Sequence, residues 1–132
     1  MKYLILDTDF LIKILRNDKT AKDYLEKILS ETNDFFITHV TLWELYQGVY
    51  NSSKVESNLK ATEELIEYLD VLPFTQAVAK KFGFLITDLN KKGTPIGVMD
   101  TLIVSTALVY NLPLVTKNRS HFDKTGIMIM EW

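Results

Sequence analysis

Three acidic residues that lie far apart in this 132-residue chain stand where they could share one site: Asp7, Glu44 and Asp100. Asp7 follows a short apolar run, Glu44 lies soon after a second run, and Asp100 opens a long apolar segment. Carboxylates brought together repel one another, because nearby like charges disfavour ionisation of the set. No Lys or Arg is adjacent to any of the three in sequence, so a divalent cation is the natural counter-charge. Hard oxygen ligands suit Mg²⁺ or Mn²⁺.

Each of these acids also has an ordinary structural explanation. Asp7 or Asp9 could cap the helical pattern that follows them, which is a common use of Asp. Thr41 and Glu44 have the spacing of a capping box. Asp100 suits the positive end of a helix. The acids therefore indicate chemistry only if the fold brings them together.

The elements that would position these acids alternate along the chain. Apolar runs rich in β-branched and aromatic residues predict strands at 3–6, 35–38, 112–116 and 127–130, with a weaker one at 71–72. Apolar residues at helical spacing predict helices at 23–31, 57–69, 75–90 and 100–110, and residues 10–13 continue a helical pattern after Asp9. This alternation predicts an α/β fold with a mainly parallel sheet.

A parallel sheet gives the acids a common location. Ligands of such sheets bind beyond the carboxyl ends of the strands, and Asp7, Glu44, Asp100 and Asn118 all fall there or on adjoining helical turns. Lys117 and Arg119 flank Asn118. A metal ion with cations nearby is what a phosphodiester needs for binding and for charge neutralisation in the transition state. The pattern therefore favours phosphodiester chemistry.

Composition excludes several classes of protein. There is no Cys, which removes disulfides, thiolate nucleophiles and Cys-based zinc sites, and the two histidines lack HxH or HExxH spacing. The formal charge of −2 argues against a broad basic surface for nucleic acid but leaves a local patch open. The longest apolar stretch is too short to cross a bilayer, and no signal-peptide pattern is present. We expect one domain over residues 1–132, in the cytoplasm and without membrane contact.

Four segments in this order resemble the PIN-domain family, and within it the VapC-type toxin ribonucleases of toxin–antitoxin pairs. They are LILDTDFLI at 4–12, THVTLWELYQG at 38–48, GTPIGVMDTLI at 93–103 and LVTKNRSHF at 114–122. The resemblance implies a three-layer α/β/α sandwich around a mainly parallel sheet. It also implies a Mg²⁺- or Mn²⁺-dependent endoribonuclease that hydrolyses RNA phosphodiester bonds, with a VapB-like antitoxin as its partner.

The resemblance further implies roles for individual residues. Asp7, Glu44 and Asp100 would hold the metal ion. Asn118, where many relatives have Asp, would orient the attacking water or the phosphate. The supporting residues would be Thr8 and Thr116, which orient the acids, Asp9, which adds to the acid count or caps the helix, and Lys117 and Arg119, which bind the RNA backbone.

Apolar residues in 57–69 and 75–90 exceed what one core needs, which suggests a homodimer.

Other functions fit parts of the same sequence. A haloacid-dehalogenase-like phosphatase would use Asp7 as nucleophile and Asp9 as acid/base, but Leu11 stands where its motif has Thr or Val, and the chain is short for such an enzyme. A receiver-like domain would explain Thr116 and Lys117, but the run at 35–38 supplies no acceptor Asp. A PIN-like binding module would have lost its acids, and here the three main ones stand.

Overall fold

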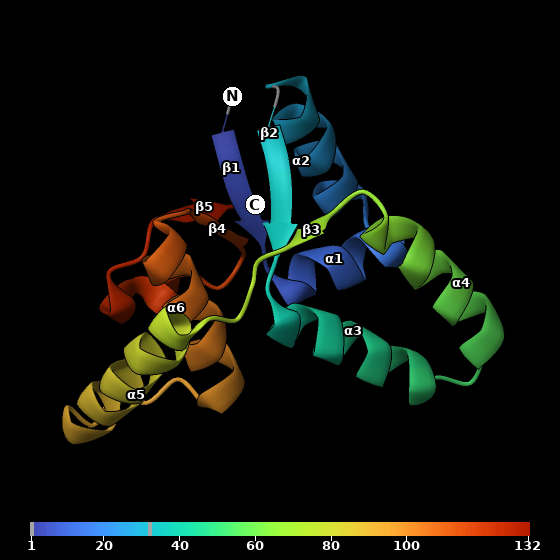
Figure 1. The fold of residues 1–132 in the computed structure, drawn as a ribbon. Coiled ribbons are helices and arrows are strands. Elements are labelled where there is room, and N and C mark those ends of the chain that lie inside the picture. Colours follow the sequence, from blue (N-terminus) through green and yellow to red (C-terminus); the bar gives the residue numbers. More distant parts are fainter. Residues whose placement is uncertain (1, 32) are drawn as a thin grey trace.

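The computed structural model describes residues 2–31 and 33–132, and within them the strands form one parallel sheet (Figure 1). The order across the sheet is β3-β2-β1-β4-β5, so β1 is central and pairs with both β2 and β4. The bounds are β1 Lys2–Leu6, β2 Asn33–Ile37, β3 Asp70–Val71, β4 Leu114–Thr116 and β5 Ile129–Glu131.

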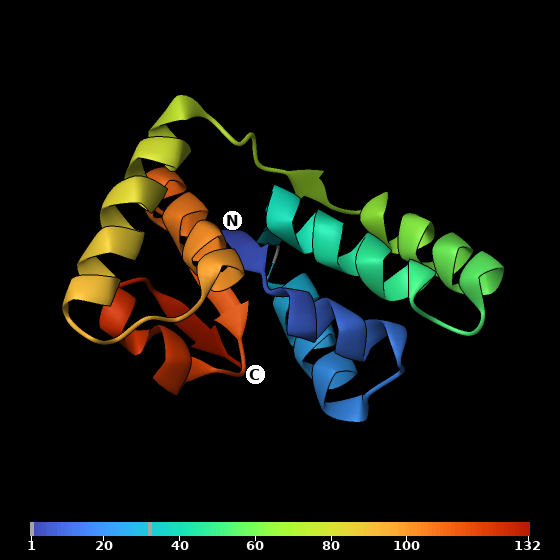
Figure 2. The ribbon, with the colours of Figure 1, turned by 90° about the horizontal axis from the view of Figure 1, so that it is seen from below.

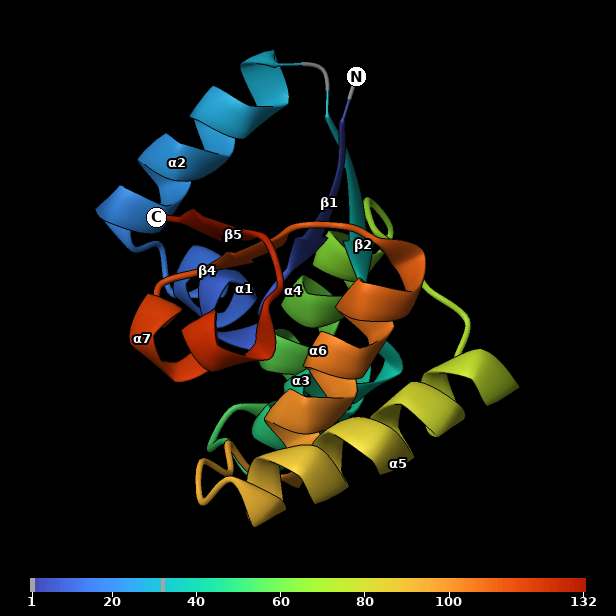
Figure 3. The same ribbon diagram turned by 90° about the vertical axis from the view of Figure 1, so that its left-hand side faces the viewer.

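Helices cover both faces of this sheet (Figure 2). One face packs against α5 and α6, and the other against α1, α2, α3 and α4. Figure 3 shows α5 and α6 running beside each other, and α7 next to β4. The bounds are α1 Thr8–Leu15, α2 Lys19–Ser30, α3 His39–Tyr50, α4 Val55–Ile66, α5 Gln76–Lys91, α6 Val98–Tyr110 and α7 Arg119–Phe122, with a 3-10 turn at Asp123–Thr125. The mainly parallel sheet and the three-layer α/β/α arrangement are confirmed.

The central strand shows why its residues are apolar on both sides. Leu4 and Leu6 pack into the core beneath α1, α2 and α3, whereas Ile5, between them, packs into the core beneath α5 and α6. All three side chains are buried, because a parallel strand flanked on both sides by strands and covered on both faces by helices meets no solvent. β1 therefore holds the residue that follows it, Asp7, on a rigid base.

The path of the chain through the sheet creates a crevice beside β1. After β1 the chain adds β2 and then β3 on one side, and it returns to add β4 and β5 on the other. Connections therefore leave β1 and β4 in opposite directions at the carboxyl edge, which is where open α/β sheets bind ligands. The residues that come directly after β1, β2 and β4 are Asp7, Thr38 and Lys117.

The predicted strands and helices are all present, with shifted ends. The strand predicted to start at residue 112 starts at Leu114, because the backbone N–H of Leu112 donates to Ala107 O and finishes α6. Asn111 makes this ending possible by adopting a left-handed conformation, with φ of 55°. None of the helices in the part of the chain that the structure describes is long and apolar enough to cross a membrane.

Candidate active site

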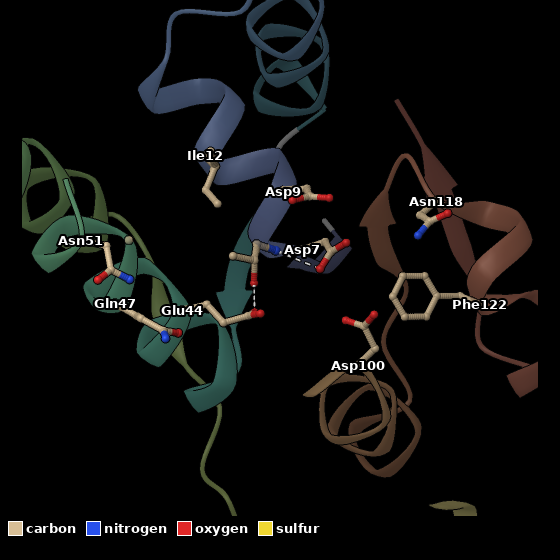
Figure 4. A pocket seen from close by; sticks show the side chains of 11 residues that line it. Asp7, Asp9, Ile12, Glu44, Gln47, Asn51, Asp100, Asn118 and Phe122 are labelled. Atoms are coloured by element: carbon tan, nitrogen blue, oxygen red, sulfur yellow. Dashed lines mark hydrogen bonds between the residues drawn. The ribbon is translucent and has the colours of Figure 1, made fainter. Parts of the chain in front are cut away.

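A cavity of about 440 Å³ opens at the carboxyl edge of the sheet and is lined mainly by polar side chains (Figure 4). Carboxylates from three segments of the chain point into it. Among the described residues no Lys, Arg or His lines this cavity. The lining residues are Asp7, Thr8, Asp9, Ile12, Glu44, Gln47, Gly48, Asn51, Asp100, Asn118 and Phe122.

Asp7 is the most buried acid of the site, with 7% of its surface exposed. It caps α1, as one interpretation of the sequence predicted: its Oδ1 accepts a hydrogen bond of 2.9 Å from the N–H of Thr8. Its Oδ2 accepts a second bond, of 2.8 Å, from the hydroxyl of Thr116 on β4. Burial raises the pKa of Asp7 to about 6; the bonds from Thr116 and Thr8 oppose this rise, and the charges of Asp100 and Asp9 add to it.

Glu44 is not part of a helix cap, so the expected capping box of Thr41 and Glu44 is wrong. α3 begins at His39, and its cap is Thr38, whose hydroxyl oxygen accepts a 3.1 Å bond from the N–H of Thr41. Both threonines are good capping residues, and β2 ends early enough for the first one to be used. Glu44 therefore lies more than one turn inside the helix, where its carboxylate has no backbone donors to satisfy.

The carboxylate of Glu44 instead turns toward α1. Its Oε1 accepts a hydrogen bond of 2.6 Å from the hydroxyl of Thr8 (Figure 4). Partial burial raises the pKa of Glu44 above its ordinary value; the bond from Thr8 opposes this rise, and the charges of Asp100 and Asp9 add to it. Thr8 thus touches two acids, Asp7 through its N–H and Glu44 through its hydroxyl.

Asp100 enters the cavity from the opposite side, in the first turn of α6. The helix starts after Gly97, whose φ of 94° is a conformation that side-chain-bearing residues rarely adopt. The Oδ2 of Asp100 lies 2.8 Å from Nε2 of His121. No role for His121 was predicted from the sequence, because its partner lies 21 positions away and shares no local motif with it.

Asn118 lies between β4 and α7, and its side chain lines the cavity next to Phe122 (Figure 4). Its backbone N–H donates a 3.2 Å bond to the hydroxyl of Thr116, which in turn donates to Asp7. The turn after β4 therefore fixes the positions of Asn118 and Asp7 together. The four residues predicted as the centre of the site, Asp7, Glu44, Asp100 and Asn118, all line one cavity.

Of the remaining predicted residues, some line the cavity and others do not. Asp9 lines the cavity but is exposed, and it does not cap α1, since Asp7 does. Lys117 and Arg119 do not line the cavity. The Nζ of Lys117 lies 4.7 Å from the centre of the Trp132 ring. Arg119 makes ion pairs of 3.8 Å with Asp123 and 3.5 Å with Glu131, which hold it against the C-terminal strand.

Sequence reasoning missed a polar wall on α3. Gln47, Gly48 and Asn51 follow Glu44 by three, four and seven positions, which places them on the same face of the helix, and all line the cavity. That spacing was the available signal. It becomes informative only once Glu44 is known to lie inside a helix that begins before Thr41.

The oxygen-rich lining suits a hard divalent cation. Every charged group that lines the cavity is a carboxylate, and amide oxygens from three side chains are also present. As placed, no three acidic or histidine side chains in the described ranges lie close enough together to bind one ion jointly. Mg²⁺ keeps several waters and is held by one or two carboxylates, so an open set of this kind fits a hydrated ion better than a closed structural site.

Comparisons with known proteins identify the family of this chain. The chain matches the PIN domain family over residues 4–127. It is 32% identical over 133 residues to the tRNA(fMet)-specific endonuclease VapC of Salmonella typhimurium, covering 100% of this chain and 99% of that protein. It is 30% identical over 127 residues to ribonuclease VapC2 of Rickettsia felis, covering 96% of this chain and 95% of that protein.

A solved structure shares the fold over almost the whole chain. The crystal structure of VapBC2 from Rickettsia felis, bound to a DNA fragment from its promoter, superposes with a TM-score of 0.89 at 29% identity, covering 98% of both chains. The sequence match and the fold therefore point to the same group of proteins. The chain belongs to the PIN-domain family and, within it, to the VapC-type toxin ribonucleases.

Proposed function

We propose that this protein is a metal-dependent endoribonuclease that hydrolyses RNA phosphodiester bonds and acts as the toxin of a VapBC-type pair. The observation that carries the proposal is the cavity beside β1, which is lined by Asp7, Glu44 and Asp100 and by no cationic residue among those described. Relatives with up to 32% identity over the full chain are named as VapC ribonucleases or endonucleases. The whole of residues 1–132 serves as one nuclease domain in this proposal.

Asp7, Glu44 and Asp100 would hold the ion together with waters of its hydration shell, and Mg²⁺ or Mn²⁺ fits their oxygen chemistry. A bound ion would supply Lewis-acid assistance to phosphodiester hydrolysis at these residues and would offset negative charge there. Asn118, with an uncharged amide at the cavity wall, orients the attacking water or the scissile phosphate by hydrogen bonding. It does so without adding a further negative charge to repel the substrate.

Supporting residues hold this centre and bind the rest of the RNA. The hydroxyls of Thr8 and Thr116 hold Glu44 and Asp7 in place by the bonds described above. Lys117 and Arg119, on either side of Asn118, bind backbone phosphates of the RNA. Asp9, exposed at the cavity edge, adds negative charge and is not assigned a catalytic step.

The partner we propose is a VapB-like antitoxin in the cytoplasm. The solved relative with a TM-score of 0.89 is a VapBC complex. An antitoxin that covers the acidic cavity would prevent RNA from reaching it.

A homodimer is the second assembly we propose. Large apolar side chains are exposed on and next to α5 and α6, with Phe84 at 65% exposure and Val98 at 56%. Burying such side chains against a second copy removes apolar surface from water. Light scattering on the purified chain should give twice the monomer mass, and Phe84→Lys should reduce it. A monomer at micromolar concentration would contradict this assembly.

The phosphatase alternative uses Asp7 and Asp9, which both line the cavity, but it explains less of the cavity than the nuclease does. It leaves Glu44 and Asn118 without a role, although both line the same cavity as Asp7. The relatives from Salmonella typhimurium and Rickettsia felis are named as an endonuclease and a ribonuclease, not as phosphatases.

Cleavage of defined RNAs tests the proposal. The purified chain is incubated with a panel that includes initiator tRNA, because a relative is named for tRNA(fMet), in Mg²⁺, in Mn²⁺ and in EDTA. We expect cleavage with either ion and none in EDTA. Asp7→Asn should abolish it, whereas Asp34→Asn, an exposed acid at the amino end of β2, should not. Equal cleavage in EDTA, or full activity of Asp7→Asn, would contradict the proposed mechanism.

A further inference from the structure

His121 makes two contacts through one ring nitrogen. Its Nε2 lies 2.8 Å from Oδ2 of Asp100 and 3.2 Å from the carbonyl oxygen of Ile96. A backbone carbonyl can only accept a hydrogen bond, and so can an ionised carboxylate. Nε2 must therefore carry a hydrogen and act as the donor to both oxygens.

The fold holds the His121 ring in this position from behind. α7 follows β4 almost directly, and the backbone N–H of His121 donates a 3.1 Å bond to Asn118 O. The ring packs edge-on against Phe122, with centroids 5.1 Å apart and planes at 79°. Phe122 is buried in the core beneath α5 and α6, with 1% of its surface exposed. The imidazole is thus anchored to the core and aimed at the first turn of α6.

Asp100 resembles the other two proposed ligands in having a donor from a different element. Asp7 accepts from Thr116, and Glu44 accepts from Thr8. For Asp100 the donor is His121, and no other side chain in the described ranges bonds to its carboxylate. The bond occupies Oδ2 and leaves Oδ1 available toward the cavity, into which the Asp100 side chain points (Figure 4).

We propose that His121 is a positioning residue of the metal site: by donating from Nε2 it holds one oxygen of Asp100 so that the other faces the ion. This inference rests on the proposed role of Asp100 as a ligand, but it does not require that RNA be cleaved. Partners that orient metal ligands in this way commonly affect metal affinity by about 10- to 100-fold.

Two substitutions and a matched control test the proposal in the full-length chain. His121→Leu removes the donor and keeps an apolar side chain against Phe122. His121→Gln places an amide N–H close to the position of Nε2. Ser120→Ala, at an exposed residue of the same helix, is the control. Calorimetric titration with Mn²⁺ gives the affinity of each variant, and thermal unfolding reports folding separately.

We expect His121→Leu to weaken Mn²⁺ binding by about 10- to 100-fold, His121→Gln to recover most of the affinity, and Ser120→Ala to bind like the unaltered chain. A long-range ¹H–¹⁵N spectrum of the unaltered chain should show hydrogen on Nε2 of His121. This measurement uses neither a variant nor RNA, so its failure to find that hydrogen would overturn the proposal even if His121→Leu did not fold, in which case the Mn²⁺ affinity of His121→Gln tests the positioning role.

The proposal is overturned by any of three results: Nε2 without hydrogen, Mn²⁺ affinity unchanged in a folded His121→Leu, or no Mn²⁺ binding by the unaltered chain. A purely structural role would lower the melting temperature of His121→Leu and leave its Mn²⁺ affinity unchanged. A chain that binds Mn²⁺, shows the His121 effect and cleaves no RNA would contradict the ribonuclease function while supporting this inference.

Discussion

The hydroxyl of Thr116 donates a 2.8 Å hydrogen bond to Oδ2 of Asp7, a residue 109 positions earlier in the chain. The bond crosses from β4 to the end of β1, which are neighbours in the sheet. It supplies one of the two hydrogen bonds that partly offset the cost of burying the Asp7 carboxylate. The acid at the centre of the site is thus held by the same pairing that forms the crevice.

The raised pKa of Asp7 makes its ionisation unfavourable for the folded protein. The pKa is about 6 in the folded chain against 3.8 for an ordinary Asp. Burial of Asp7 therefore does not lower the free energy of unfolding below pH 4, where the group is protonated, and lowers it by the full amount above pH 6, where it is ionised. In EDTA, Asp7→Asn should therefore unfold at higher urea concentration than the unaltered chain at pH 8. The gain should be about 2 to 3 kcal/mol, at about 1.4 kcal/mol per pKa unit.

The same comparison at pH 4 should show little or no gain, since Asp7 is then protonated in the folded chain. Urea unfolding at several pH values between 4 and 8 measures the difference. A gain that does not depend on pH would show that the Asp7 charge is not its cause.

Removal of the Thr116 hydroxyl should destabilise the protein at neutral pH. Thr116→Val leaves the Asp7 carboxylate without its donor from β4 and the N–H of Asn118 without an acceptor. The expected loss is about 1.5 to 3 kcal/mol, the range for hydrogen bonds to charged groups. Thr116→Ser keeps the hydroxyl and should lose much less. Equal losses for Val and Ser, measured by urea unfolding, would indicate that packing rather than the hydroxyl matters.

Capping of α3 should depend on Thr38 and not on Glu44. Thr38→Ala removes the cap and should cost about 1 kcal/mol, within the usual range for such substitutions. Glu44→Gln keeps an oxygen for the Thr8 hydroxyl. It also removes a carboxylate whose raised pKa shows that its ionised form is unfavourable in the folded chain, so it should not destabilise the fold. It should nevertheless abolish RNA cleavage. Thermal unfolding and a cleavage assay on both variants separate the two roles, and a large stability loss in Glu44→Gln would count against this division.

Lys117 and Arg119 should affect RNA binding rather than folding. Arg119 is half exposed and paired with Asp123 and Glu131, and exposed ion pairs contribute at most about 1 kcal/mol. Alanine at either position should therefore raise KM for RNA and leave kcat nearly unchanged. If each side chain binds one phosphate, the slope of the logarithm of the binding constant against the logarithm of the salt concentration should become shallower by about one per substitution. Unchanged KM and salt dependence would remove both residues from the RNA-binding surface.

Much of the fold follows from local patterns. The central strand was predictable because Leu4, Ile5 and Leu6 are apolar on both faces, which only a buried parallel strand requires. Element ends were less predictable, since they depend on where single backbone groups find partners. The donation from Leu112 N–H to Ala107 O, which delays β4, is one such case.

In the candidate site, too, some features could be predicted from the sequence and others could not. The types and order of Asp7, Glu44, Asp100 and Asn118 could be taken from the sequence, since strands and helices alternate around them. The true cap of α3 could not, because Thr38 and Thr41 are equally suitable and only the end of β2 selects between them.

By itself the sequence determined the class of fold and the residues that could carry the chemistry, because hydrophobic periodicity and acid placement are local properties. Only the tertiary structure decided which side chain supports each acid: Thr116 for Asp7, Thr8 for Glu44 and His121 for Asp100. Each of these bonds joins two elements, and a hydrogen bond needs a separation of about 3 Å. Spacing along a chain says nothing about that distance until the sheet has formed.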